Sequence, residues 1–329
     1  MTVKIAMIGL GHNGLAFCEE YAKNHKSQLV AVCDLDQNRV KYASEKYQVA
    51  GYTDYSVLDH PGLDAVSIHT GDSAHKEPFL LSLKKGKHVF VEKPMANTVE
   101  DVLEMTETAS RHPDLVSQVG QVLRFVNQYT VIKRLVDSGF FGEIAYMEAD
   151  YIHDLRYQYY MEEWKVTDEI PMVGGGCHPL DLLRWYGGEV TEVSAISNHI
   201  TYKQMHEETS IVATYKFKSG AIGKVTCLYG SPGPCPDMYN LKIYGTKASL
   251  VQRKICIDAI GDMWIDLPGG LFVPSHPYAP EVDHFLDCIV NGTKCIVPAW
   301  DGGMSAIATL LAAESAKDGM KKIIPDISR

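Results

Sequence analysis

No apolar run in the sequence reaches the roughly 18–20 residues that a helix needs to span a bilayer. The N-terminus enters a strand-like run directly, without the charged, apolar and small-residue regions of a signal peptide. Excess positive charge is also lacking: the formal net charge of -10 disfavours nucleic acid, whose binding needs clustered Lys and Arg against phosphates. We therefore expect a cytoplasmic protein that binds neither membrane nor nucleic acid.

Cysteine pairs of the C-x-x-C type are absent, and the cysteines are scattered along the chain, so we expect no structural zinc site and no other metal. Most should be reduced, buried, small hydrophobes. Cys177 adjoins His178 in a glycine-rich turn, where a Cys/His nucleophile is conceivable, although adjacent residues rarely point at one another. The eight cysteines are Cys18, Cys33, Cys177, Cys227, Cys235, Cys256, Cys288 and Cys295.

Strand and helix signals alternate through the first 120 residues, which predicts βαβ units and a doubly wound parallel sheet. The length of 329 residues suggests two domains, and we place them at residues 1–124 and 125–329. The expected strands are Val3–Ile8, Leu29–Cys33, Ala65–His69, His88–Val91 and Leu115–Val119, and the expected helices are Leu15–Lys23, Gln37–Tyr47, Ser73–Lys85 and Val99–Arg111.

The second half is β-rich and predicts an α+β domain with a large open, mainly antiparallel sheet. Because one face of that sheet would lack a helical cover, we expect a homodimer or homotetramer through it. The last two helices should return to the first domain, with Asp301 as the N-cap of the final one. The expected elements are a helix at Gln128–Val136, strands at Ile144–Tyr151, Glu192–Ile200, Thr209–Phe217, Ala221–Leu228, Asn240–Tyr244 and Ala248–Gln252, and helices at about His178–Trp185, Glu281–Val290 and Met304–Lys317.

The first strand ends in Gly-x-Gly-x-x-Gly, and a helix follows at once. In such a turn Gly9 makes the tight bend, Gly11 lets the backbone approach a pyrophosphate, and Gly14 allows close helix–strand packing. The N–H groups at the helix start, around His12 and Asn13, would then bind the anion. Glycine-rich turns also have plain structural uses, so the motif needs support from elsewhere in the chain.

That support comes from Asp34, which ends the second strand twenty residues after Gly14. An acidic group there hydrogen-bonds the adenosine ribose hydroxyls of NAD and repels a 2′-phosphate. Leu35 and Asp36 follow, with no Arg to take that phosphate, so NAD is expected rather than NADP. The alternative is that Asp34 caps the next helix.

Polar residues also follow the next two strands, where the nicotinamide half of the cofactor would pass. Thr70 and His75 lie in one such turn, and His75 is equally well explained as a packed histidine. Glu92 and Lys93 end the other strand, ahead of a proline. Lys93 is either a solvated surface lysine or a group for proton transfer to or from a substrate hydroxyl.

With these motifs the sequence resembles the Gfo/Idh/MocA oxidoreductases, over nearly the whole chain. The matching segments are the glycine motif, Asp34, Glu92-Lys93-Pro94, Val119-Gly120-Gln121, Arg124-Phe125, Phe141-Gly142-Glu143-Ile144, Trp164-Lys165, Gly174-Gly175-Gly176 and His178-Pro179-Leu180-Asp181.

The resemblance implies an N-terminal Rossmann domain and an NAD(P)-dependent oxidoreductase acting on a sugar, polyol or related hydroxy compound. Lys93 would lie near the reacting carbon, and His178 would be the catalytic histidine with Asp181 as its orienting or sugar-binding neighbour. It also adds Gln121 to the cofactor-binding residues and Arg124 to the substrate-binding ones.

One position departs from the family pattern. Many of these dehydrogenases carry an Asp four residues before the histidine, and this chain has Gly174 there. Asp181, Asp154 or His153 would have to compensate, or the chemistry differs.

The segment 151–164 holds five aromatic residues together with His, Asp and Arg, which is unusual for a connector. Flat rings and hydrogen-bonding groups suit a carbohydrate pocket, although an ordered loop or a subunit interface would use the same residues. The expected substrate contacts are Arg124, Tyr151, His153, Asp154, Arg156, Tyr157, Trp164 and Cys177.

Three functions fit these features. The first is an NAD-dependent sugar or polyol dehydrogenase or reductase in which Lys93, His178 and Asp181 are catalytic. The second is a lyase or glycosidase that uses tightly bound NAD transiently, for oxidation followed by elimination. The third is a non-catalytic NAD- or sugar-binding protein.

Overall fold

The computed structural model describes the whole chain except residues 1, 156–165, 233–237, 262, 268–275 and 328–329. The chain divides into two compact units, the first made of residues 1–122 and 277–304 and the second of residues 123–276 and 305–328. The first unit therefore contains more than the expected residues 1–124, because a late helix and the start of the last helix, within residues 277–304, also belong to it. Each unit contains its own sheet.

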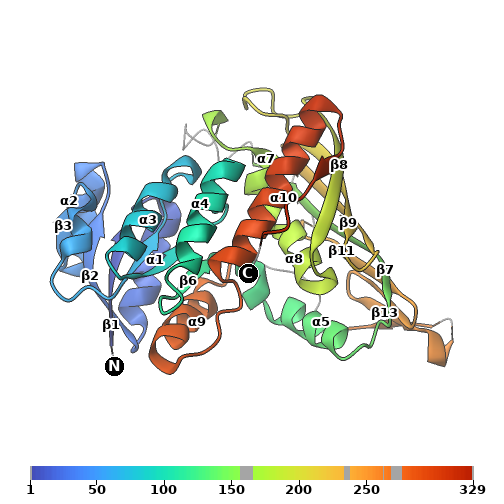
Figure 1. Cartoon of the computed structure of the whole chain (residues 1–329), viewed down its shortest axis with the longest axis horizontal. Coiled ribbons are helices and arrows are strands. Elements are labelled where there is room, and N and C mark those ends of the chain that lie inside the picture. Colours follow the sequence, from blue (N-terminus) through green and yellow to red (C-terminus); the bar gives the residue numbers. More distant parts are fainter. Residues whose placement is uncertain (1, 156–165, 233–237, 262, 268–275, 328–329) are drawn as a thin grey trace. The chain divides into compact units, whose positions relative to one another are not determined.

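The first unit holds a six-stranded sheet in the order β3-β2-β1-β4-β5-β6, with every pair parallel (Figure 1). The chain order reverses between β1 and β4, and in a doubly wound sheet ligands bind at such a switch point, beyond the carboxyl ends of the strands. The strands are β1 (Val3–Ile8), β2 (Ser27–Cys33), β3 (Ala50–Tyr52), β4 (Ala65–Ile68), β5 (His88–Val91) and β6 (Ser117–Val119).

Helices cover both faces of this sheet, as the near-continuous burial of its central strands requires. Helices α1, α2 and α9 join one core with residues of β1, β2 and β5, while α3 packs against α4 and against β4 and β5. The helices of this unit are α1 (His12–Lys23), α2 (Gln37–Tyr47), α3 (Lys76–Lys84), α4 (Val99–Ser110) and α9 (Tyr278–Asn291), with short 3-10 turns η1 (Tyr55–Asp59) and η2 (Asp72–Ala74).

The second unit holds a nine-stranded sheet in the order β14-β13-β12-β11-β7-β10-β9-β8-β15. All pairs are antiparallel except β7 with β10. The strands are β7 (Ile144–His153), β8 (Val190–Asn198), β9 (Ser210–Phe217), β10 (Ile222–Tyr229), β11 (Leu241–Gly245), β12 (Ala248–Val251), β13 (Lys254–Ile257), β14 (Trp264–Asp266) and β15 (Lys322–Ile323).

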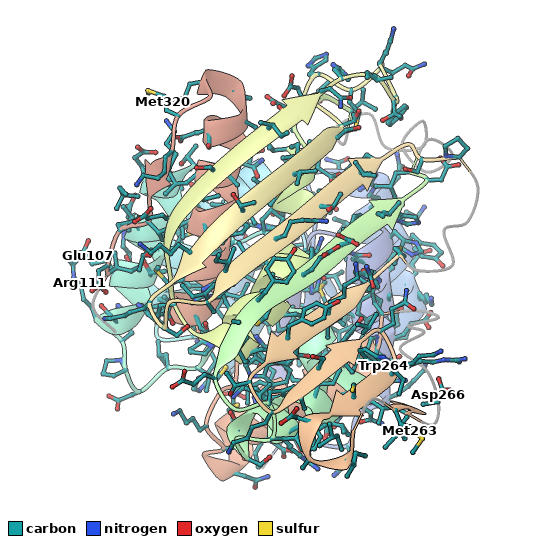
Figure 2. The ribbon with its side chains drawn as sticks, turned by 90° about the vertical axis from the view of Figure 1, so that its right-hand side faces the viewer. Glu107, Arg111, Met263, Trp264, Asp266 and Met320 are labelled. Carbon is teal, nitrogen blue, oxygen red and sulfur yellow. The ribbon has the colours of Figure 1, made fainter. Side chains whose placement is uncertain are left out.

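One face of this sheet is packed and the other is open, because burial alternates along β9 and β10. Helix α8 (Cys177–Gly187) packs against β7, and the short α7 (Pro171–Gly174) packs against β10. Helix α5 (Asn127–Asp137) packs on α8. In Figure 2 the strands lie in front of the helices, with Met263, Trp264 and Asp266 at the β14 edge.

The open face carries charge at its centre. Glu148 on β7 lies directly opposite Lys242 on β11 and Lys224 on β10, and its Oε1 is 2.9 Å from Lys224 Nζ and 3.1 Å from Lys242 Nζ. Partial burial opposes ionisation of Glu148, but the two lysines outweigh it and lower the pKa of its carboxyl group.

The predicted α/β class and the two sheet types are confirmed. Gln37–Tyr47, Val3–Ile8 and His88–Val91 match their predicted bounds. The prediction that Asp301 caps the last helix is wrong: α10 (Ala299–Asp318) begins two residues earlier, and Asp301 lies in its first turn, where its N–H donates to Pro298 O at 2.9 Å.

The sequence analysis missed the short strands β3, β13, β14 and β15, because two to four residues show no clear alternation. Among the described residues, no helix is long and apolar enough to cross a membrane.

Candidate active site

The turn after β1 is tightly packed at two of its three glycines. Gly9 has φ +94°, and a Cβ there would lie 2.5 Å from the backbone of His69, at the end of the neighbouring β4. A Cβ on Gly14 would lie 2.0 Å from the carbonyl oxygen of Gly9. Both positions therefore require glycine for the close packing of β1, β4 and α1.

Gly11 differs, because its Cβ would meet nothing nearer than 3.9 Å. It is the N-cap residue of α1 and has no side chain to bond the free N–H groups of the first turn. His12 and Asn13 begin the helix and are exposed. Packing does not explain the glycine at position 11, and the predicted approach of an anionic ligand to the helix N-terminus would use this space.

Asp34 braces this turn from the end of β2. Its Oδ2 accepts the N–H of Leu10 at 2.7 Å, and its Oδ1 accepts the N–H of Asp36 at 2.9 Å. The N-cap of α2 is Asp36, which accepts from the N–H of Asn38, so Asp34 is not needed as a cap. The expectation that no arginine lies here is wrong, since Arg39 Nη1 is 3.9 Å from Asp34 Oδ2.

His75 is fully buried, and its ring links two of the turns that follow the sheet strands. Nδ1 is 2.9 Å from the carbonyl oxygen of Pro94 and Nε2 is 3.2 Å from that of Thr70. Burial lowers the pKa of His75 despite these two carbonyl groups, so the ring is neutral. His75 thus links the turn after β4 to the Glu-Lys-Pro turn, and its contact with the cofactor stays a prediction.

Glu92 and Glu281 form a buried pair of carboxyl groups with opposite pKa shifts. Burial opposes ionisation of Glu92, but His69, 3.5 Å away, and Lys93 outweigh it and lower its pKa. Burial, reinforced by the charge of Glu92, raises the pKa of Glu281 well above its usual range. Glu92 is therefore the ionised member and Glu281 the protonated one.

Lys93 is half-buried and follows Glu92 at the carboxyl end of β5, and its N–H donates to Glu92 Oε2 at 3.1 Å. At the neighbouring end of β6, Gln121 is buried, and its Oε1 has no hydrogen-bond partner among the described residues. The same holds for Thr70 Oγ1, within the part of the chain that the structure covers. A parallel sheet thus gathers Asp34, Thr70, Lys93 and Gln121 at one edge.

In the second unit, His178 begins helix α8 and lies among other rings. It stacks on Tyr151 at a centroid distance of 5.9 Å and 24°, meets Tyr239 edge-on at 5.9 Å, and lies 5.6 Å from the ring of His276. Only 2% of its surface is exposed. Its backbone position, one residue after the start of the helix, favours a neutral imidazole.

Asp181 lies one turn further along α8, and its carboxylate is bonded to Arg124 and Ser305. Arg124 donates to it twice, through Nε to Oδ2 and through a terminal nitrogen to Oδ1, both at 2.7 Å. Ser305 also donates to Oδ1, at 2.8 Å. Asp181 and Arg124 are 1% and 2% exposed, and each satisfies the other in the core. Their contact with substrate stays a prediction.

A carboxylate that the sequence analysis did not consider lies beside Gly174. A Cβ built on Gly174 would be 2.2 Å from Oε1 of Glu169. Glu169 is 8% exposed, and its Oε1 accepts the hydroxyl of Tyr229 at 2.6 Å. Glu169 therefore occupies the volume that a side chain at position 174 would need.

The other two glycines of this turn are equally crowded. A Cβ on Gly175 would lie 2.6 Å from the ring of Tyr229, and one on Gly176 would lie 2.5 Å from the carbonyl oxygen of Met172. The run of three glycines in the sequence was therefore the signal that other side chains, among them Glu169, fill the space around this turn.

The remaining predicted substrate contacts divide into three groups. Tyr151 and His153 lie at the end of β7, with Tyr151 Oη 3.2 Å from His153 Nδ1, and Asp154 follows them. Cys177 is fully buried, and its thiol donates to the carbonyl oxygen of Gly174 at 3.3 Å; its contact with substrate stays a prediction. Arg156, Tyr157 and Trp164 lie outside the described residues.

Models of one protein family match both halves of the chain. Residues 3–120 match the model described as "Oxidoreductase family, NAD-binding Rossmann fold". Residues 129–251 match the "GFO/IDH/MocA C-terminal domain".

Individual relatives agree with this family match. The chain is 26% identical to scyllo-inositol 2-dehydrogenase (NAD(+)) of Bacillus subtilis over 97% of its own length and 95% of the relative. It shares its fold with an oxidoreductase from Agrobacterium radiobacter in complex with NAD+, L-tartaric acid and magnesium, at a TM-score of 0.86 and 20% identity, covering 98% and 99% of the two chains. Scyllo-inositol dehydrogenase from Lactobacillus casei, with bound NAD(H) and scyllo-inositol, gives a TM-score of 0.83 at 22% identity over 98% and 99%.

Proposed function

This chain belongs to the GFO/IDH/MocA oxidoreductase family, and on that premise we propose that it is an NAD-dependent dehydrogenase or reductase of a polyol or sugar. The observation that carries the proposal is the sheet edge of the first unit, where the braced Asp34, the open Gly11 and the half-buried Lys93 follow strands of one parallel sheet. The inositol dehydrogenase activity of the relative supports a polyol as the substrate class.

The residues present fit NAD. Gly11 leaves space at the N-terminus of α1 for the pyrophosphate, and Asp34 offers a carboxylate for the ribose hydroxyls. Bound NAD supplies the hydride acceptor, or the donor in the reverse direction. Thr70 Oγ1 and Gln121 Oε1 are buried oxygens without a hydrogen-bond partner among the described residues, and such acceptors suit the nicotinamide half.

We assign the hydroxyl proton of the substrate to Lys93 and His178. A neutral amine or imidazole accepts the proton when the substrate is oxidised, and the ammonium or imidazolium so formed returns it in the reverse direction. The backbone at Lys93 is held by Glu92 and by the His75–Pro94 contact, and the ring of His178 stacks on Tyr151. His153 and Asp154 remain proposed substrate contacts.

Glu169 takes the role that the resemblance gave to an acidic residue at position 174. It is a positioning residue in this proposal, acting through Tyr229 and Tyr151 on His178. Tyr229 bonds Glu169, the rings of Tyr151 and Tyr229 lie 5.8 Å apart, and Tyr151 stacks on His178.

A panel of inositols, sugars and sugar acids, assayed by NADH absorbance with the purified protein, tests the function. One class should give stoichiometric NADH in the oxidative direction. Product formation without net NADH would instead identify transient oxidation followed by elimination. Binding of NAD without turnover of any class would indicate the non-catalytic alternative.

Lys93→Ala tests the catalytic assignment once a substrate is known. The rate should fall about 10²–10⁴-fold, which is the usual contribution of a positioned acid or base. The exposed Lys84→Ala is the matched control and should keep the wild-type rate. An unchanged rate in Lys93→Ala would remove Lys93 from the mechanism.

The open face of the nine-stranded sheet supports a homodimer or homotetramer as the assembly. Exposed apolar side chains lie on it beside the Glu148 cluster, among them Ile196 at 73% and Ile222 at 53% exposure. Burying about 800 Å² on each partner is the usual size of a stable interface.

A further inference from the structure

A cluster of metal-ligating side chains lies at the end of α9, apart from the residues assigned to the oxidoreductase site. His284 and Cys288 are four residues apart on the helix and so share one face. Cys295 follows in the segment after the helix, and one ligand atom from each of the three lies within 4.8 Å of the others. The spacing, His-x3-Cys-x6-Cys, contains no C-x-x-C pair, which is why the sequence analysis passed over it.

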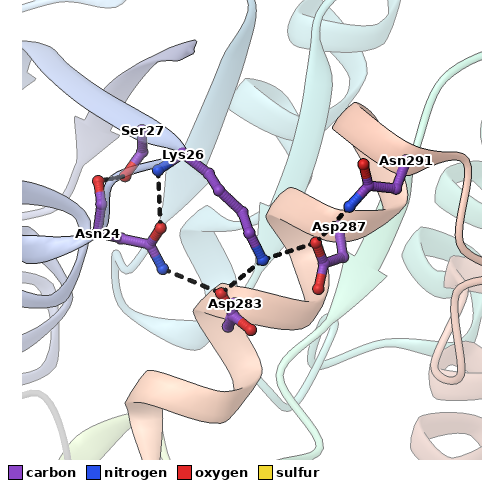
Figure 3. Close-up of polar contacts among 6 residues, drawn as sticks. All are labelled: Asn24, Lys26, Ser27, Asp283, Asp287 and Asn291. Atoms are coloured by element: carbon purple, nitrogen blue, oxygen red, sulfur yellow. Dashed lines mark hydrogen bonds and ion pairs between the residues drawn. The ribbon is translucent and has the colours of Figure 1, made fainter. Parts of the chain in front are cut away.

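The rotation of α9 is fixed by a charged network on an adjoining face (Figure 3). Lys26 Nζ lies 2.9 Å from Asp283 Oδ1 and 2.6 Å from Asp287 Oδ1. Asn24 donates to Asp283 at 3.3 Å and Asn291 to Asp287 at 2.8 Å. Because these carboxylates immediately precede His284 and Cys288, they hold the two ligands in a defined direction.

The segment carrying Cys295 is fixed independently by β6. The carbonyl oxygen of Val297 accepts the N–H of Val119 at 3.0 Å. The Cys295 thiol is 3.9 Å from Oε1 of the buried Gln118. Two separately anchored elements thus bring the ligand atoms together, instead of one flexible loop.

The Nε2 atom of His284 is placed as a hydrogen-bond acceptor, as a metal ligand must be. The N–H of Ile296 donates to His284 Nε2 at 3.1 Å. A backbone N–H can only donate, so Nε2 carries a lone pair. A bound ion would take this lone pair in place of the N–H.

The spacing of ligand atoms suits zinc. His284 Nε2 and Cys288 Sγ are 3.5 Å apart. Tetrahedral zinc with Zn–S of about 2.3 Å and Zn–N of about 2.0–2.1 Å places such atoms about 3.6 Å apart. The partial exposure of His284 and Cys295 leaves a path for the ion and room for water as a fourth ligand.

We propose that His284, Cys288 and Cys295 form a site for a thiophilic divalent cation, with Zn²⁺ as the best match. On binding, the two thiols lose their protons to solvent and the imidazole loses none. The ion ties the last turn of α9 to the segment beside β6, so it acts on the first unit as a structural clamp. The proposal is independent of the oxidoreductase function.

Cobalt titration of the reduced full-length protein, followed by visible absorption, is the direct test. One equivalent should bind with the thiolate-to-cobalt charge-transfer band and the strong d–d bands of a tetrahedral site, and zinc should displace it. Cys288→Ser and Cys295→Ser should each weaken binding at least about tenfold and reduce the charge-transfer band. His284→Gln should weaken binding but keep that band.

Cys256→Ser, a change on β13 of the other unit, is the matched control and should bind as the wild type does. Thermal melting with and without added zinc gives a second readout: the wild type and Cys256→Ser should melt higher with the ion, and the ligand variants should not. Equal cobalt binding by the wild type and the cysteine variants would overturn the proposal. So would isolation of Cys288 and Cys295 as a disulfide, two hydrogens lighter by mass, in protein purified without added oxidant.

Discussion

At the scale of single residues, the side chain of Glu169 fills the space that is left by the absence of a side chain at Gly174. The family pattern has an acidic residue four positions before the histidine, and this chain has Gly174 at that position. The structure offers a carboxylate five residues earlier in the chain, at the same place. The carboxyl group of Glu169 occupies the volume that an acidic side chain at position 174 would need.

A double substitution tests this exchange. Glu169→Ala should lower kcat about 10²-fold or more with little change in KM, and adding Gly174→Asp should recover part of the rate by returning a carboxylate to the vacated volume. Glu169→Gln should move the pH-rate limb of His178 to lower pH, because removal of a negative charge disfavours the imidazolium.

Gly174→Asp alone is the control, and it should be poorly tolerated because Glu169 already fills the space. A purely structural Glu169 would leave the pH profile in place and show no rescue.

We propose that Asp34 and Arg39 together set the choice between NAD and NADP. Asp34→Ser removes the charge that repels a 2′-phosphate and leaves Arg39 beside it, so the ratio of kcat/KM for NAD over NADP should fall at least about tenfold. Adding Arg39→Ala should abolish the gain with NADP.

Asp36→Asn keeps the helix cap and should leave the preference unchanged. Steady-state kinetics with both cofactors decide the outcome, and an unaltered ratio in Asp34→Ser would contradict the role of Asp34.

Glu281 gives a pH dependence whose sign follows from its raised pKa. Above the ordinary pKa of glutamic acid, the unfolded chain ionises Glu281 while the folded chain keeps it protonated, so stability is lost as pH rises towards the folded pKa. Glu281→Gln should therefore unfold at higher denaturant than the wild type at neutral pH, with no gain near pH 4.

The exposed Glu45→Gln is the control and should behave as the wild type at both pH values. Denaturant titrations across this range make the comparison. A stability loss in Glu281→Gln at pH 7 would mean that Glu281 is ionised in the folded protein.

At the scale of elements, the turn between β1 and α1 contains one glycine that packing requires and another that we expect NAD binding to require. Gly9→Ala forces a Cβ against the backbone of His69 at positive φ and should cost about 1–3 kcal/mol of stability. Gly11→Ala meets open space and should fold normally, yet weaken NAD binding by occupying the approach of the pyrophosphate.

Calorimetry of unfolding and of NAD binding distinguishes the two variants. Equal NAD affinity in Gly11→Ala and the wild type would show that the pyrophosphate does not approach this turn.

At the scale of the whole molecule, the open sheet face predicts self-association. Replacing Ile196 and Ile222 by Lys places two charges among the exposed apolar side chains, and the assembly measured by light scattering should fall to a monomer. Val131→Lys, a change on the half-exposed side of α5, should leave the wild-type mass. A monomeric wild type at micromolar concentration would contradict the assembly.

Sequence periodicity predicted the long elements because their burial repeats over many residues, as in β10 and α2. The short edge strands escaped it because their pairing comes from neighbours in space. The same distinction applies to the candidate site: Asp34 and Lys93 were predicted because each lies at the end of a strong strand, whereas Glu169 follows no recognisable element.

The sequence by itself determined the family and the parallel sheet and predicted which residues bind the cofactor, because a glycine turn and strand-end residues are local patterns with a local mechanism. Tertiary structure decided which charges are available. Asp181 shares a helix face with His178, but its carboxylate oxygens accept hydrogen bonds from Arg124 and Ser305. The carboxyl group of Glu169 lies against Gly174. Whether a charged side chain is free to act depends on hydrogen-bond partners that are distant in sequence. The spacing of residues along the chain cannot reveal those partners.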